Sequence, residues 1–162
     1  TSGVGVELWK LDGSGNPVLV KDINAGSGSS SPNQLFAFDG QLYFTADDGI
    51  RGREVWTSDG TTAGTVLVED VNGRTGSSSP SNLIDVAGTL YFTASDGVVG
   101  VRLWRVDPTT GIPEVVVVPG EAASNPGAFF DQFTAVQGSL FFRDQANNRL
   151  ITIDASTGDP VV

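Results

Sequence analysis

The stretch EVWTSDGTTAGTVLVEDV, from Glu54 to Val71, decides the fold because its features return along the chain. Trp56 has counterparts at Trp9 and Trp104, at spacings of 47 and 48 residues, and Ile151 stands 47 residues beyond Trp104. An aspartate follows three residues after each of these positions: Asp12, Asp59, Asp107 and Asp154. A fixed period of about 20 to 50 residues is typical of solenoids, propellers and arrays.

Two further landmarks keep the same order in each copy. One is a proline motif, and the other is an aromatic cluster. The proline motif occurs as Ser31-Pro32, Ser79-Pro80 and, more loosely, Asn125-Pro126; the aromatic cluster occurs at Leu42–Phe44, Leu90–Phe92 and Leu140–Phe142. Together they predict a structural repeat of about 48 residues.

The spacing of turn residues predicts four short strands per repeat. In the second copy the expected strands are Glu54–Ser58, Val66–Val71, Asn82–Val86 and Thr89–Ala94. The pairs Asp39-Gly40, Ala87-Gly88 and Gln137-Gly138 predict tight hairpins between the third and fourth strands. A short helix is expected around Ala128–Phe133.

Several expected strands are apolar on both faces, as at Phe36–Phe38 and Val115–Val118, and such strands need cover above and below. We therefore expect an all-β fold, a partial β-propeller of about 3.5 four-stranded antiparallel blades. A β-sandwich with Greek-key connections is the alternative. The expected blade units, about 1–48, 49–96 and 97–145 with a partial unit 146–162, would form a single repeat domain over 1–162.

An incomplete ring leaves apolar faces and strand edges open at its ends. Three solutions are expected. The chain is a segment of a longer propeller, or several copies complete a ring or filament, or a different protein covers the ends.

The stretch from Glu54 to Val71 closely resembles the ELWxxDGT repeat, also described as hyalin-like, of large bacterial surface and secreted proteins. Residues 7–23 match it more loosely, and the copies around Asp107 and Asp154 keep an Asp and a Gly without the DGT core. The resemblance implies propeller-like arrays in extracellular, adhesin-type proteins. It implies no catalytic residues.

The charge balance excludes several partners. With 19 acidic and 9 basic residues, the net charge is −10, which disfavours nucleic acid and anionic membranes. No apolar run approaches the roughly 18 residues of a membrane span, so membrane insertion is not expected.

The absence of His, Cys and Met from the sequence removes imidazole bases, cysteine nucleophiles and thiolate metal sites. A serine nucleophile would have to rely on Lys10 or Lys21. Glycoside hydrolysis needs only two carboxylates, but nearly every Asp sits in a repeated turn. We expect no enzymatic activity.

Three loops supply the candidate binding residues. Asp47, Asp48, Arg51 and the equivalent Asp96 are candidates for ligand or partner contact, against the alternative of solvated turns. Asp12, Ser14 and Asn16 place oxygen atoms at alternate positions, which makes calcium the candidate cofactor, although these aspartates also suit turn capping. The tryptophans are expected to pack between blades.

The expected function is a non-catalytic scaffold or adhesion module of a bacterial surface or secreted assembly, binding protein or glycan at the cell surface. One alternative is an accessory subunit whose open blade ends associate with other copies or a larger complex. A second alternative is a glycan-processing propeller enzyme.

Overall fold

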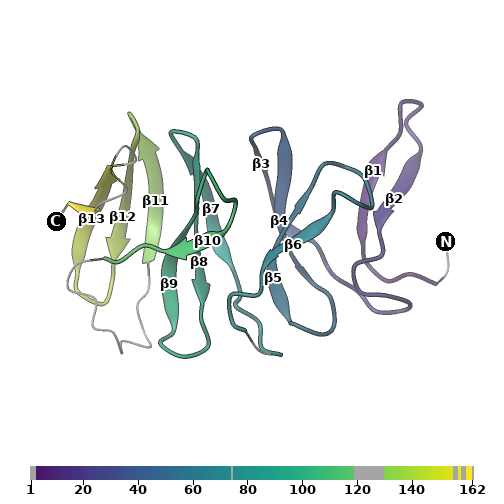
Figure 1. The fold of residues 1–162 in the computed structure, drawn as a ribbon, viewed down its shortest axis with the longest axis horizontal. Helices are drawn as coiled ribbons and strands as arrows, with labels where there is room; N and C mark the ends of the chain where they lie inside the picture. Colours follow the sequence, from purple (N-terminus) through teal and green to yellow (C-terminus); the bar gives the residue numbers. More distant parts are fainter. Residues whose placement is uncertain (1–2, 74, 119–129, 155–156, 158–159, 162) are drawn as a thin grey trace. The chain divides into compact units, whose positions relative to one another are not determined.

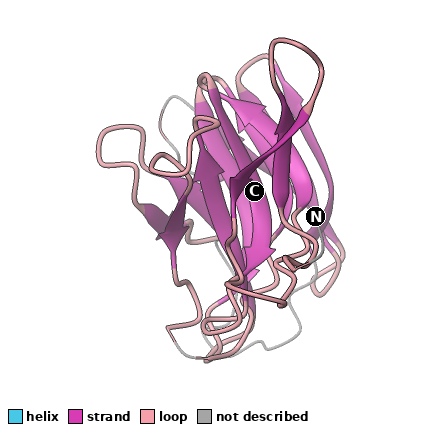
Figure 2. Ribbon diagram, turned by 90° about the vertical axis from the view of Figure 1, so that its right-hand side faces the viewer, coloured by secondary structure: helices cyan, strands magenta, loops and turns pink. Residues whose placement is uncertain are grey.

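The chain consists of strands and turns, and the computed structural model describes residues 3–73, 75–118, 130–154, 157 and 160–161. No helix occurs in these residues (Figure 2), so none is long and apolar enough to cross a membrane. The fold is all-β, as expected, and its antiparallel sheets have two or four strands.

The strands form one two-stranded sheet and three four-stranded sheets (Figure 1). The two-stranded sheet contains β1 (Leu8–Leu11) and β2 (Pro17–Lys21). The next sheet contains β3 (Asn33–Phe38), β4 (Gln41–Asp47), β5 (Arg53–Ser58) and β6 (Val66–Glu69). The third contains β7 (Ser81–Val86), β8 (Thr89–Ser95), β9 (Val101–Val106) and β10 (Pro113–Val115). The last contains β11 (Phe130–Val136), β12 (Ser139–Asp144), β13 (Arg149–Asp154) and β14 (Pro160–Val161).

The chain divides into two compact units, Thr1–Ser79 and Pro80–Val162. In the first unit, residues of β1–β2 and the connection after it share one core with β4 and β5. This core contains Leu8, Val20, Ile23, Phe44, Ala46 and Trp56. The unit is therefore held together by one sheet packing against the next.

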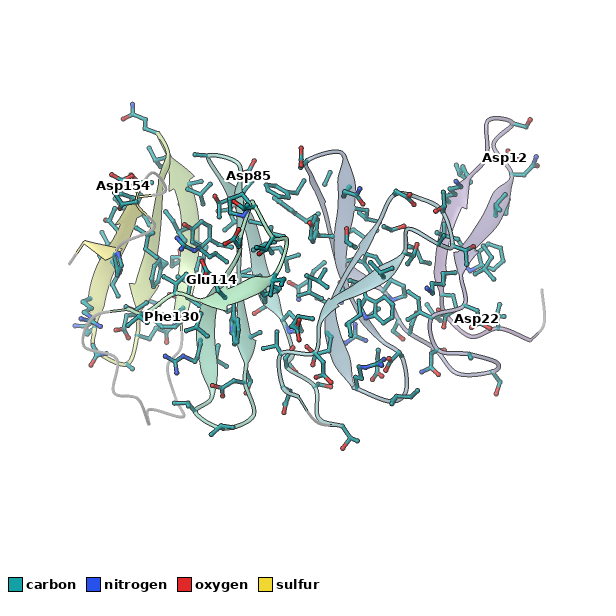
Figure 3. The ribbon with its side chains drawn as sticks, in the orientation of Figure 1. Asp12, Asp22, Asp85, Glu114, Phe130 and Asp154 are labelled. Atoms are coloured by element: carbon teal, nitrogen blue, oxygen red, sulfur yellow. The ribbon has the colours of Figure 1, made fainter. Side chains whose placement is uncertain are left out.

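In the second unit, the β7–β10 sheet shares a core with the β11–β14 sheet. This core includes Val86, Tyr91 and Leu103 from the first of these sheets and Phe130, Leu140, Phe142, Ile151 and Ile153 from the second. Phe142 stacks on Phe133 and makes an edge contact with Phe130, which begins β11 (Figure 3).

The central strands are buried on both faces, as their apolar composition predicts. Phe44, Thr45 and Ala46 are consecutive buried residues of β4, and Leu90–Ala94 are all buried in β8. Consecutive side chains of a strand point to opposite faces, so each of these strands has cover on both sides.

The expected hairpins are confirmed. Ala87 and Gly88 are the two loop residues between paired Val86 and Thr89, with φ of 51° and 81°. Asp39-Gly40 and Gln137-Gly138 have the same geometry. Positive φ at both central residues is the type I′ turn, whose twist matches that of the strands.

Strand pairing supports the equivalence of the repeated aromatic positions. Phe44 pairs with Trp56, Phe92 with Trp104, and Phe142 with Ile151. Ile151 thus occupies the position of the tryptophans, as the sequence spacing predicts. The separations within these pairs are 12, 12 and 9 positions, so the β12–β13 hairpin is three residues shorter than the other two.

Two sequence expectations differ from the structure. The helix expected around Ala128–Phe133 is wrong in its described part, because β11 begins at Phe130 and Phe130 pairs with Asp144; residues 128–129 lie outside the described residues. The sheets also do not follow the expected unit boundaries. Each four-stranded sheet combines the hairpin that ends one expected repeat with the first two strands of the next expected repeat. The reason is that the strand at the tryptophan position (β5, β9 or β13) pairs with the hairpin before it. The single repeat domain over 1–162 stays a prediction.

Candidate functional site

A buried glutamate joins β5 to the connection that follows β6. Glu54 is fully buried on β5, between Arg53 and Val55. Its Oε1 accepts a hydrogen bond of 2.8 Å from Ser78 N, and its Oε2 accepts bonds from Ser78 Oγ at 2.5 Å and Val71 N at 3.3 Å. The carboxylate therefore holds both ends of the connection between residues 71 and 78.

The preceding copy contains the same arrangement. Glu7 is 5% exposed, and its Oε1 accepts a bond of 2.8 Å from Ser30 N. Its Oε2 accepts bonds from Ser30 Oγ at 2.6 Å and Ile23 N at 2.8 Å. We call Glu7 with Ile23 and Ser30, and Glu54 with Val71 and Ser78, the glutamate–serine clamps.

Neighbouring serines extend each clamp to the backbone. Ser77 Oγ accepts a bond of 2.9 Å from Arg53 N, and Ser79 N donates to Arg53 O at 3.3 Å. In the first copy Ser29 Oγ accepts from Val6 N at 2.9 Å, and Ser31 N donates to Val6 O at 3.0 Å. All three serines of each SSSP sequence thus bond to the segment around the glutamate.

Glycines allow the two segments of each clamp to approach closely. A Cβ added at Gly5 would lie 1.7 Å from the backbone oxygen of Gly28. At the equivalent Gly52 an added Cβ would lie 2.7 Å from Ser77 N. Side chains at these positions would force the backbones apart.

Burial raises the pKa of Glu54 above its ordinary value of 4.5, although hydrogen bonds from Ser78 and Val71 act in the opposite direction. The charged form is thus disfavoured by loss of water and supported by three donors. In the second unit the equivalent strand position is Arg102, which pairs with Ala94 as Glu54 pairs with Ala46. Most of the connection after β10, residues 119–129, lies outside the described residues.

The DGTTAGT turn after β5 joins the sheet of β3–β6 to the sheet of β1–β2. Asp59 Oδ1 accepts bonds from Thr61 N at 2.8 Å and Thr61 Oγ1 at 2.7 Å, which shapes the turn. Thr62 Oγ1 then donates to Val20 O at 2.6 Å, and Lys21 Nζ donates to Thr65 O at 2.7 Å. The repeated Asp59 and the threonines of this turn therefore bond to the chain's own backbone and side chains.

The predicted calcium ligands lie together in the β1–β2 turn, at the tip labelled Asp12 in Figure 3. Asp12 Oδ1 accepts bonds of 2.8 Å from both Ser14 N and Asn16 N, and Oδ2 accepts from Asn16 Nδ2 at 3.3 Å. The backbone bond from Asn16, followed by its side-chain bond, lowers the pKa of Asp12. The carboxylate caps its own turn, and the calcium site stays a prediction.

Asp48 and Arg51 lie together in the β4–β5 hairpin loop, next to Asp47, the last residue of β4. Asp48 Oδ1 accepts bonds from Ile50 N at 2.9 Å and Arg51 N at 2.8 Å, while Oδ2 pairs with Arg51 Nη1 at 2.5 Å. Asp47 Oδ1 accepts from Gly49 N at 2.8 Å. Burial acts to raise the pKa of Asp48, but the bonds from Arg51 and Ile50 outweigh it, and the pKa lies below its ordinary value.

Asp96 occupies the same place in the β8–β9 loop of the second unit. Its Oδ1 accepts bonds from Val98 N at 2.9 Å, Val99 N at 2.7 Å and Gly100 N at 3.2 Å. Burial again acts to raise the pKa of Asp96, and these bonds hold it below the ordinary value. Asp48 and Asp96 therefore shape their loops, and Arg51, with 46% of its side chain exposed, is the more accessible charge.

The sequence prediction missed the apolar tips of these two loops. Ile50 is 68% exposed and Val98 is 78% exposed. Both residues directly follow an Asp-Gly pair at equivalent positions of the repeat, and this shared position could have identified them from the sequence. In the third hairpin the tip is polar instead, and buried Asp144 pairs with Arg149 at 2.9 Å and accepts a bond from Asn147 Nδ2 at 2.8 Å.

Among the described residues, no three acidic side chains gather into a group that could hold a metal ion. No family model matches the chain, and no curated protein matches it. The resemblance to the ELWxxDGT repeat therefore stays a prediction.

Proposed function

We propose that this chain is a non-catalytic scaffold or adhesion module, built as part of a β-propeller, that acts at a bacterial surface or in a secreted assembly. The observation that carries the proposal is that the repeated polar residues form hydrogen bonds within the chain itself. Glu7, Glu54 and Asp59 all accept hydrogen bonds from the chain's own backbone. The repeat thus builds a framework, and the loops between strands are left for recognition.

The propeller part of the proposal is supported by sheet packing within each unit. Each core joins side chains from one antiparallel sheet to those of the next sheet along the chain. Central strands buried on both faces need such neighbours. Extracellular location is proposed from the resemblance to surface and secreted repeats.

The loop tip of each unit is proposed, separately, as a contact surface for protein or glycan. Ile50 and Val98 present aliphatic side chains to solvent, and Arg51 adds a positive charge beside the first of them. Asp48 and Asp96 hold the backbones of these loops in place. Apolar side chains on pre-shaped loops lose little conformational freedom on binding, which favours affinity.

A binding experiment tests the proposal. The chain would be screened against a glycan array and against purified surface proteins, and any ligand found would be re-measured with an Ile50→Ser/Val98→Ser variant. We expect at least tenfold weaker binding for this variant and unchanged binding for Ile112→Ser, which alters an exposed side chain in the β9–β10 turn.

The same protein tests the absence of catalysis. We expect no hydrolysis of a polysaccharide panel by the wild-type chain. Hydrolysis that Asp47→Ala abolishes would overturn the proposed function and favour a glycan-processing enzyme.

A further inference from the structure

The two-stranded sheet β1–β2 is built like the second half of the sheet β3–β6. Trp9 pairs with Leu19 as Trp56 pairs with Leu67. Both pairs are preceded by a register shift at the same place, between Leu8 and Trp9 and between Val55 and Trp56. β1 and β2 therefore correspond to β5 and β6 residue by residue.

The two sheets differ on one edge. β5 pairs with β6 on one side and with β4 on the other, whereas β1 pairs only with β2 in the part of the chain that the structure describes. Figure 1 shows β1 and β2 as a separate pair of strands. The edge of β1 that corresponds to the β4 side of β5 therefore has no strand paired to it among these residues.

The exposure of the aromatic side chain follows the missing strand. Trp9 is 38% exposed, whereas Trp56, which lies opposite Phe44, is 6% exposed. Leu11 is 69% exposed, whereas the equivalent Ser58 is 2% exposed. The clamp of Glu7, the residue directly before β1, is already formed. β1 is therefore already folded as a strand, and its apolar side chains Trp9 and Leu11 are exposed to solvent.

We propose that the free edge of β1 binds the β-hairpin of a further repeat unit, which adds two antiparallel strands and completes a four-stranded sheet. The register follows from the β4–β5 pair. A phenylalanine of the added strand lies opposite Trp9, and an alanine lies opposite Glu7, as Phe44 lies opposite Trp56 and Ala46 opposite Glu54. Backbone hydrogen bonds supply affinity in this mode, and the side chains supply register.

The chemistry of the hairpin is read from the copies in the chain. Phenylalanine lies opposite the tryptophan position in all three four-stranded sheets, at Phe44, Phe92 and Phe142. These three hairpins, β3–β4, β7–β8 and β11–β12, are each engaged in their own sheet. A second folded copy of the chain therefore has none of them to donate, which favours a repeat unit outside these residues.

This inference goes beyond the proposed scaffold role, since it names an edge and its partner and would stand if the loop tips bound nothing. The test is a chimera in which a copy of residues 33–51 replaces residues 1–4, directly before Gly5. Gly5 corresponds to Gly52, so the graft reproduces the natural β4–β5 connection. The matched control carries Phe44→Asp in the grafted copy alone, which leaves the remainder of the chain intact.

Two measurements report on β1 itself. Amide hydrogen exchange of Leu8–Leu11 should slow by at least about tenfold in the chimera relative to the control, because new strand pairing protects these amides. Acrylamide quenching of Trp9, taken as the difference between each protein and its Trp9→Phe variant, should fall severalfold. A chimera whose β1 exchange and Trp9 quenching equal those of the control would overturn the proposal.

Light scattering of the wild-type chain tests whether a second copy of the chain occupies the β1 edge instead. We expect a monomer with an accessible Trp9. A dimer in which Trp9 is already protected from quenching would also overturn the proposal, because a second copy would then occupy the edge.

Discussion

Removing the buried carboxylate of Glu54 should destabilise the fold by an amount that the clamp geometry sets. Glu54→Ala leaves Ser78 N without its 2.8 Å acceptor and Val71 N without its 3.3 Å acceptor. Ser78 Oγ keeps one alternative acceptor, Arg53 O, at 3.4 Å. A buried donor without a partner costs about 1–3 kcal/mol, so we expect a loss of about 2–4 kcal/mol in the free energy of unfolding, the longer Val71 bond counting least.

Glu54→Gln should cost less, about 1–2 kcal/mol, because the amide keeps the shape and one acceptor but turns an N–H toward another donor. Urea unfolding followed by circular dichroism measures both values. Glu69→Ala is the matched control, since Glu69 is an exposed residue of β6 in the same sheet, and it should change stability by less than about 0.5 kcal/mol. Equal effects of Glu54→Ala and Glu69→Ala would refute the clamp.

The pH dependence has a defined sign. Burial raises the pKa of folded Glu54 above the ordinary 4.5, so the folded state binds this proton more tightly than the unfolded state. The favourable contribution of protonation is fully present below pH 4.5 and is lost as the pH rises through the folded pKa. The difference in free energy of unfolding between wild type and Glu54→Gln should therefore become smaller from pH 4 to pH 7. A difference that grows over this range would contradict the raised pKa of Glu54.

Three further predictions concern single positions. Ala87→Asn should stabilise the protein by about 0.5–1 kcal/mol, because Ala87 has a φ of 51° in a type I′ turn that favours asparagine; thermal unfolding measures it, and a lower melting temperature would argue against the turn. Gly5→Ala should cost about 1–3 kcal/mol in urea unfolding because its Cβ meets the Gly28 oxygen, whereas Gly13→Ala, with no atom within 4 Å of its Cβ, should be tolerated; equal effects of the two would show that the close approach is not present. The pKa of Asp96 is lowered, so its stabilising contribution is present above pH 3.8 and is lost as the pH falls below it; Asp96→Ala should therefore lose less stability on acidification than wild type, and an unchanged acid transition would contradict the cap.

The repeat and its hairpins could be predicted from the sequence because they depend on local signals. Ala87-Gly88 in a tight turn and Ile151 in the place of a tryptophan follow from turn chemistry and period alone. The strands of the second copy were confirmed to within one or two residues. The helix near Phe130 was wrong because pairing with Asp144 outweighs local preference.

The clamps were not predicted, although their parts were visible. A glutamate two residues before the tryptophan, in two copies, was the available signal. Its partner serine is 23 residues away in one copy and 24 in the other, so no local pattern connects them. Asp12, Asp48 and Asp96 lie in turns as predicted, whereas Asp47 is the last residue of β4. Only the structure shows that the carboxylates of Asp12, Asp48 and Asp96 accept bonds from the N–H groups of their own turns.

A double-mutant cycle between Glu54→Gln and Ser78→Ala tests most directly whether the repeated polar residues build the framework. If the two side chains act on each other as the 2.5 Å bond indicates, their effects on the free energy of unfolding should be non-additive by about 1–2 kcal/mol. The same coupling is expected between Glu7→Gln and Ser30→Ala. Additive effects in both pairs would contradict the account, because the repeated residues would then be free for another role.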